Sequence, residues 1–169
     1  MTGKGSLNHN SRKFHAKNTD PNRTHWNVEY CNEDIKDVYH ELFDDALKRY
    51  NDKQTRKDRK IDDYYEKIRS GKQEKLFHEV ILQIGDKDNM GSETMEGQLA
   101  AKILDEYMKG FQERNPTLRV FAAHLHLDEA TPHLHIDFIP YVTGSKRGLD
   151  TRVSLKQALS SLGFKGGSR

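Results

Sequence analysis

The chain has 169 residues, of which 34% are hydrophobic and 32% are charged, and its formal net charge is +2. This length allows one domain of ordinary size, but the low apolar content implies a lean core beneath a strongly charged surface. Cys31 is the only cysteine, no apolar run approaches a membrane span, and no signal-peptide pattern opens the chain. These features exclude disulfide scaffolds and membrane insertion, and we expect a soluble cytoplasmic protein.

The first 32 residues are polar and rich in histidine, asparagine and basic side chains. Two clusters stand out, HNSR at residues 9–12 and NRTHWN at residues 22–27. The segment has too little periodicity to predict a helix, and only Trp26–Tyr30 has the composition of a short strand. It is either a flexible surface arm or an arm that wraps a ligand.

The middle of the chain predicts three helices and one strand. Apolar residues three and four apart predict helices from Asp34 to about Arg49 and over Lys60–Ser70. Leu76–Ile84 is typical of a strand, and a long helix from Ser92 to about Arg114 follows, stopped by an Asn-Pro pair. The apolar positions of this long helix include Leu99, Ile103, Leu104, Tyr107, Met108 and Phe111.

Polar and apolar residues alternate on both sides of a short turn at Asp128–Pro132, which predicts a β-hairpin. Because side chains along a strand point to opposite faces in turn, His133 and His135 share one face while Leu134 points to the other. His126 lies on the corresponding face of the first arm. If the apolar faces lie on a common core, the imidazoles of both arms converge on the opposite side of the sheet.

Three convergent imidazoles with acids between them predict a divalent metal site. Neutral imidazole nitrogens are common metal ligands, and Glu129 at the end of the hairpin could add an oxygen ligand. The alternative is that the histidines are simply solvated. The grouping of His126, His133 and His135 favours the metal site.

The end of the chain adds a basic loop at residues 143–148 and a helix. Ser154 and Gln157 have the spacing of a capping box that opens a short helix to Leu162. The predicted order gives an α+β fold, in which a central antiparallel β-sheet carries the histidine hairpin and helices back one of its faces. We find no linker, so residues 1–169 are expected to form a single domain. The lack of a stop signal at the end indicates the N-terminal part of a longer protein.

His126 and the segment at residues 128–135 (DEATPHLH) closely resemble the histidine motif of the MobV (Mob/Pre) family of plasmid mobilisation relaxases. These are HUH endonucleases, named for the pair matched here by His133-Leu134-His135. The clusters at residues 9–12 and 22–27 resemble two further motifs of the family, in the same order. The resemblance implies a metal-dependent enzyme that nicks one DNA strand at an origin of transfer, stays bonded to the 5′ phosphate and later rejoins the strand. It also implies origin DNA and the conjugation machinery as partners.

The resemblance also assigns roles to individual residues. It implies that His9 is the nucleophile, and a neutral imidazole could attack phosphorus directly to give a phosphoramidate. Arg12 could bind and orient the same phosphate. The implied metal ligands are His126, His133, His135 and Glu129. The family and the phosphate chemistry favour Mn²⁺, with Mg²⁺ or Zn²⁺ as alternatives.

DNA contacts are expected from the N-terminal arm and from the basic C-terminal part. Phosphate contacts of this kind make affinity fall steeply as salt rises. The residues expected to bind DNA are Asn10, Arg23, His25, Asn27, Lys146, Arg147, Arg152 and Lys156.

Two other functions compete with the relaxase interpretation. The first is a replication initiator or transposase of the same HUH group, with a tyrosine nucleophile among Tyr39, Tyr50, Tyr64 and Tyr65. Tyr64 and Tyr65 are adjacent, but both lie in the apolar stripe of a predicted helix, which favours packing. The second is a non-catalytic, metal-stabilised DNA-binding module, which would bind DNA without nicking it. The motifs do not specify the oligomeric state.

Overall fold

The computed structural model describes residues 6–14 and 16–164, and they form two compact units. Of the described residues, the first unit contains 6–14, 16–32, 78–114 and 120–138, and the second contains 33–77, 115–119 and 139–164. The strand order is β1–β3–β4–β2, and a fifth strand, β5, pairs with β4. The strands are β1 (Val28–Asn32), β2 (His78–Gln83), β3 (Leu118–His126), β4 (His133–Val142) and β5 (Arg152–Val153).

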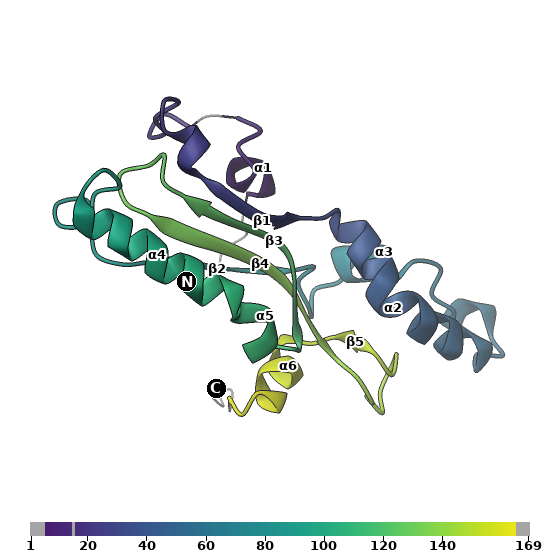
Figure 1. Ribbon diagram of the computed structural model, residues 1–169. Helices are drawn as coiled ribbons and strands as arrows, with labels where there is room; N and C mark the ends of the chain where they lie inside the picture. Colours follow the sequence, from purple (N-terminus) through teal and green to yellow (C-terminus); the bar gives the residue numbers. More distant parts are fainter. Residues whose placement is uncertain (1–5, 15, 165–169) are drawn as a thin grey trace. The chain divides into compact units, whose positions relative to one another are not determined.

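The first unit places its apolar core between the sheet and helix α4 (Met95–Lys109), which runs along the strands in Figure 1. Leu134 and Ile136 of β4 and Leu104 of α4 are among its buried side chains. The hydroxyl of Tyr30 on β1 donates a 2.7 Å hydrogen bond to Asp105 of α4. The alternation predicted for the hairpin therefore directs its leucine and isoleucine side chains into a helix-covered core.

The long predicted helix divides at Gly110 into α4 and the short α5 (Phe111–Arg114). It begins after Thr94, whose side chain accepts a hydrogen bond from the amide of Gly97. The core face consists of small residues together with Leu104 and Met108. Three apolar positions that periodicity placed with this face, Leu99, Ile103 and Tyr107, are exposed. A Cβ at Gly97 would overlap the carbonyl of Gly91, so this face packs closely only with small side chains.

The N-terminal arm is more ordered than its composition predicts. It contains helix α1 (Leu7–Asn10) and a 3₁₀ turn, η1 (Thr24–Trp26), before β1. The side chain of Ser6 caps α1 by accepting a hydrogen bond from the amide of His9. A single helical turn shows no periodicity in the sequence, because apolar spacing needs two or more turns to become visible.

The second unit contains α2 (Ile35–Asp52), the 3₁₀ turn η2 (Lys57–Arg59), α3 (Tyr64–Ser70), β5 and α6 (Leu155–Ser161). Helix α3 begins later than predicted, because Asp63 is extended and caps the helix by accepting from the amide of Glu66. The predicted cap at Ser154 is confirmed, since its side chain accepts from the amide of Gln157. In the part of the chain described, no helix has the length and apolar character needed to cross a membrane.

Three aromatic side chains form the centre of the second unit. The ring of Phe43 lies 5.1 Å from that of Tyr39 and 5.0 Å from that of Tyr64, between ring centroids. The hydroxyl oxygen of Tyr64 also accepts a hydrogen bond from the amide of Val153. Tyr64 is therefore a packing residue, as the apolar stripe predicts.

The two leucines Leu134 and Leu99 provide a matched test of where the core lies. Leu134 is 0% exposed and Leu99 is 59% exposed. Leu134→Ala is expected to lower the free energy of unfolding by about 2–5 kcal/mol through lost burial and a cavity. Leu99→Ala should change it by less than about 0.5 kcal/mol, because exposed sites are tolerant. Urea unfolding of both variants checks this assignment, and equal effects would contradict it.

Candidate active site

Three histidines from the hairpin converge on the face of the sheet opposite the apolar core. Ring centroids lie 4.8 Å apart for His126 and His135, 5.2 Å for His126 and His133, and 5.0 Å for His133 and His135. None of the three residues is more than 9% exposed. The convergence expected from strand alternation is present.

The two histidines of β4 are oriented by their Nδ1 atoms. His133 Nδ1 lies 2.8 Å from the carbonyl oxygen of Thr131, and His135 Nδ1 lies 2.7 Å from Oε1 of Glu79. A carbonyl and a carboxylate can only accept, so Nδ1 carries the proton in both rings. The Nε2 atom of each ring then has its lone pair available, and a carboxylate behind a histidine is a frequent support of metal ligands.

His126 is oriented in the opposite sense. Its Nε2 lies 2.8 Å from the carbonyl oxygen of Asn10, so Nε2 donates and Nδ1 holds the lone pair. Within the described residues, His126 Nδ1 and His135 Nε2 are buried without a hydrogen-bond partner. Buried polar atoms normally have partners, so two such lone pairs in one cluster fit a site for a cation.

Burial keeps His126 and His133 neutral. It lowers the pKa of His126 to about 2, with nearby Arg12 adding to the effect, and it also lowers the pKa of His133. Neutral rings are the form that binds metals, because protonation would remove the lone pair.

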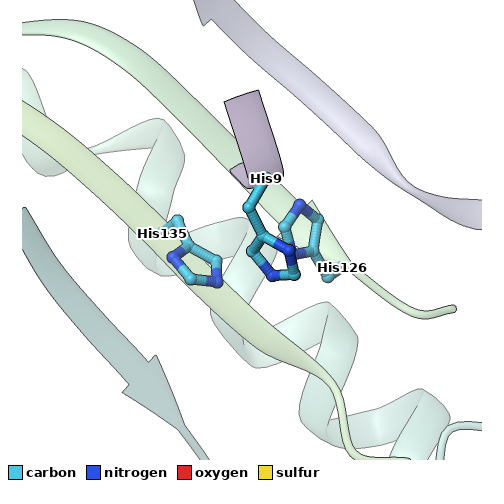
Figure 2. A group of neighbouring side chains, drawn as sticks. All are labelled: His9, His126 and His135. Carbon is cyan, nitrogen blue, oxygen red and sulfur yellow. The ribbon is translucent and has the colours of Figure 1, made fainter. Parts of the chain in front are cut away.

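The described part of the chain contains two groups of side chains that could hold a metal ion, and within each group the ligand atoms lie within 4.8 Å of one another. The first group is His9, His126 and His135, and the second is His126, Glu129 and His133. His126 belongs to both groups, whereas the three hairpin histidines do not form one such group by themselves. Figure 2 shows the first group, with His9 projecting from α1 towards the two strands and a helix behind them. The structure thus brings together the expected metal ligands and the expected histidine nucleophile: His9, His126, Glu129, His133 and His135.

His9 lies at the rim of this cluster, and 23% of its side chain is exposed. Its Nε2 is 3.2 Å from Nη1 of Arg12 and 3.4 Å from Oε1 of Glu129. Because a guanidinium can only donate, the contact with Arg12 uses the lone pair of Nε2. Burial lowers the pKa of His9, and the charge of Arg12 lowers it further. His9 is therefore a neutral imidazole with an accessible nitrogen at physiological pH.

Arg12 is fixed by the two acids of the hairpin turn. Its Nε donates to Asp128 at 2.9 Å, and its Nη2 donates to Asp128 and, at 2.9 Å, to Glu129. Burial alone would raise the pKa of Asp128, but the hydrogen bonds and the charge of Arg12 oppose this effect, and the pKa is lowered to about 2. Arg12 has a φ of +52°, a left-handed conformation that is uncommon for residues other than glycine.

Two residues expected to bind DNA instead support the hairpin turn in this structure. Asn27 Oδ1 accepts hydrogen bonds from the amides of Leu127 and Asp128, at 2.7 and 3.1 Å. Arg23 Nη1 donates to the carbonyl oxygens of Leu127 and Glu129. His25, by contrast, is exposed.

Asn10 requires a correction. It was expected to contact DNA, yet it is 1% exposed. Its Nδ2 donates to Glu79 Oε1 at 2.8 Å and to Asp137 Oδ2 at 3.0 Å. The amide is occupied by buried carboxylates, so it does not face an external ligand.

Glu79 and Asp137 are site residues that sequence reasoning missed. They are direct partners in the pairing of β2 with β4. Burial would raise the pKa of Glu79, but hydrogen bonds from His135 and Asn10 outweigh it and lower the pKa. Burial and the charge of Glu79 raise the pKa of Asp137 to about 7. A polar residue inside an otherwise apolar strand was the available signal for each.

The basic residues expected near the C-terminus belong to the second unit. Lys146, Arg147 and Lys156 are exposed, and Arg152 is half-buried and donates to Ser145 and Gln157. A hollow of about 710 Å³ in this unit has four cationic residues in its lining. They are Lys67, Lys72, Arg147 and Arg152, and none of them is in an ion pair within the described residues.

Comparisons with known proteins identify the family. Residues 4–162 match the family described as plasmid recombination enzyme. A plasmid recombination enzyme of Streptococcus agalactiae is 24% identical over 165 residues, which are 94% of this chain and 30% of the relative. The chain therefore spans less than a third of that relative.

Two crystal structures of the Mn-bound MobM relaxase domain (MOBV; Mob_Pre) with 22-nucleotide oriT DNA of plasmid pMV158 are also similar. The structure at pH 5.5 is 27% identical with a TM-score of 0.51, over 89% of this chain and 67% of that chain. The structure at pH 4.6 is 25% identical with a TM-score of 0.48, over 90% and 67%. The expected α+β fold, with its antiparallel sheet and histidine hairpin, is confirmed. The chain belongs to the MobV (Mob/Pre) family of plasmid recombination enzymes.

Proposed function

We propose that this chain is a relaxase domain that nicks one DNA strand at an origin of transfer, joins the 5′ phosphate to His9 and later rejoins the strand. The observation that carries the proposal is the position of a neutral His9 beside His126 and His135, with Arg12 in contact with its Nε2. The similar MobM relaxase domain, bound to oriT DNA, supports it. A single relaxase domain as the N-terminal part of a longer protein stays a prediction, as does the conjugation machinery as a partner.

The metal ligands we propose are His126 through Nδ1 and His133 and His135 through Nε2, because the other nitrogen of each ring is already bonded. Glu129 is the adjacent carboxylate, with Oε1 3.8 Å from Nε2 of His133. A divalent cation bound here would neutralise charge on the scissile phosphate. We favour Mn²⁺ because the similar MobM domain is Mn-bound, and Mg²⁺ and Zn²⁺ are the alternatives.

The chemical step we propose is an in-line attack of the His9 Nε2 lone pair on phosphorus. An N–P bond forms, the P–O3′ bond breaks, and the 3′ oxygen leaves with the bonding electrons and takes up a proton to become a hydroxyl. The imidazole then loses its Nδ1 proton to solvent, leaving a phosphoramidate on the 5′ side. The reverse sequence rejoins the strand, with the 3′ hydroxyl as nucleophile.

Arg12 places a positive charge beside the attacking nitrogen of His9. Its guanidinium is held by Asp128 and Glu129, so it presents a fixed positive charge beside Nε2. A phosphate placed at Nε2 would meet this charge, and charge-assisted contacts orient phosphates well. The same charge disfavours protonation of His9, which preserves the nucleophile.

The tyrosine alternative has less support from the second unit. Tyr39 is 2% exposed and donates its hydroxyl proton to the carbonyl oxygen of Leu76. Burial raises the pKa values of Tyr39 and Tyr64, which disfavours the phenolate needed for attack.

The first prediction concerns the nucleophile. His9→Ala should abolish the covalent protein–DNA adduct while DNA binding is retained, because the imidazole supplies the attacking nitrogen. The assay incubates a supercoiled origin-bearing plasmid with Mn²⁺ and tests whether the protein on the 5′ end is released by acid, as a phosphoramidate would be. His40→Ala is the control, since His40 is an exposed histidine of α2 bonded to Asp44.

Two outcomes of this experiment would count against the proposal. An adduct that persists in His9→Ala would favour a tyrosine nucleophile. DNA binding by the wild type without any nick would favour the non-catalytic module.

The second prediction concerns the metal. His133→Ala should weaken Mn²⁺ binding to the metal-free protein by more than about 10²-fold, since loss of an outer support alone costs 10–100-fold. Isothermal titration calorimetry measures this directly, and His40→Ala should bind as the wild type does. Unchanged affinity in His133→Ala would remove His133 from the ligand set.

The third prediction concerns the cationic hollow of the second unit, which we propose binds DNA phosphates. Arg147→Ala should reduce the slope of log affinity against log salt by about 0.7–0.9, the value of one phosphate contact. Fluorescence anisotropy over a salt series measures the slope. Arg56→Ala is the control, because Arg56 is already paired with Asp58. Equal slopes for Arg147→Ala and wild type would place the DNA elsewhere.

A further inference from the structure

We propose that Asn10 is a positioning residue that fixes His9 over the histidine cluster by clamping α1 onto two buried carboxylates of the sheet. The expected effect of Asn10 on nicking rests on the function proposed above, whereas its expected effect on the order of α1 does not. Asn10 acts through its neighbour His9 and touches no reacting atom.

Helix α1 cannot orient His9 by itself. It has four residues, Leu7–Asn10, and isolated helices of that length are unstable in water. Its orientation must therefore come from contacts with the rest of the first unit. Asn10 is the buried residue of α1 and the one whose side chain enters the sheet's polar face.

The side chain of Asn10 donates to two carboxylates at once. Glu79 and Asp137 lie opposite each other on β2 and β4, on the same face as His135. Two acids at directly opposite positions repel each other, and burial makes the lack of a donor costly. Asn10 gives one N–H of Nδ2 to each carboxylate, at 2.8 and 3.0 Å. An aspartate at this position could not replace it, because a carboxylate has no N–H to donate.

The same residue also contacts both histidine strands. Its carbonyl oxygen accepts from Nε2 of His126 on β3. Its carboxylate partner Glu79 is the acceptor for Nδ1 of His135 on β4. The ring centroid of the adjacent His9 lies 5.9 Å from that of His126 and 6.2 Å from that of His135. Figure 2 shows the three side chains grouped together. One residue thus ties the proposed nucleophile to two of the proposed ligands.

The test compares Asn10→Ala with Asn8→Ala. Both remove a carboxamide from the same helix, but Asn8 is exposed. Amide hydrogen exchange of the metal-free protein should show loss of protection at residues 7–12 in Asn10→Ala only. With Mn²⁺ and origin DNA, single-turnover nicking should fall by about 10²-fold in Asn10→Ala, the effect of misplacing a reacting group by about 1 Å. Mn²⁺ affinity should fall by less than in His133→Ala, because the proposed ligands lie on β3 and β4 and Asn10 only supports two of them.

A donor–acceptor swap provides the rescue. Asn10→Asp alone should behave as Asn10→Ala or worse, since three carboxyl groups would meet without the amide N–H donors that join Glu79 to Asp137. The double variant Asn10→Asp/Asp137→Asn moves the carboxamide from α1 to the sheet. It keeps one carboxamide and two carboxylates in the cluster, and the side chains at positions 10 and 137 keep nearly the same size. It should recover protection at residues 7–12 and a large part of the nicking rate.

The outcomes separate this inference from the proposed function. Wild-type protection of residues 7–12 in Asn10→Ala would overturn the inference. A loss of Mn²⁺ affinity as large as that of His133→Ala would also overturn it. If Asn10→Ala loses protection across the whole first unit, the swap decides: recovery supports positioning and no recovery overturns it. If the wild type does not nick but exchange depends on Asn10 and recovers in the swap, the proposed function fails and the positioning role stands.

Discussion

The alternation of side chains along β4 is the constraint on which the site depends. Leu134 and Ile136 are fully buried on the face covered by α4. Because successive side chains point to opposite faces, His133 and His135 must lie on the other face of the sheet. A slip of one residue in the strand register would bury the imidazoles in the apolar core and expose the leucine. The hydrophobic core therefore fixes the position of the polar cluster without contacting it.

The second face of the sheet is also buried, and its packing is polar. Arg12 donates hydrogen bonds to Asp128 and Glu129 of the turn. Asn10 donates to Glu79 of β2 and Asp137 of β4. A network of this kind is stable only when its members have partners, and it then holds its side chains rigidly. This arrangement suits a chain with few apolar residues, because hydrogen-bonded polar groups complete an interior that hydrophobic side chains alone could not fill. Among the described atoms, the lone pairs left without partners on His126 and His135 are those that a cation would use.

Features set by periodic residue patterns or by local spacing could be predicted from the sequence. Features that depend on contacts between residues far apart in the sequence could not. Strand alternation gave the convergence of the hairpin histidines, and the cap at Ser154 followed from local spacing. The short helix α1 was missed because one turn shows no periodicity, and because its Asn10 contacts partners that lie 69 and 127 residues away. The exposure of Leu99 was missed because periodicity shows two apolar rows on α4 but does not say which one meets the sheet. The metal site at the hairpin histidines was predicted from alternation, whereas the roles of His9 and Arg12 came from family resemblance, and all of these roles remain proposals.

At Arg12 the main-chain conformation favours glycine, whereas the contacts of the site require a guanidinium side chain. Its φ of +52° follows directly after the end of α1, where glycine is the residue that most often completes a helix. Glycine there would relax the main chain and remove the guanidinium that both acids of the turn require. A redesign guided by conformational stability alone would therefore choose glycine at this position. The more stable variant would lack the positive charge that we propose orients the phosphate.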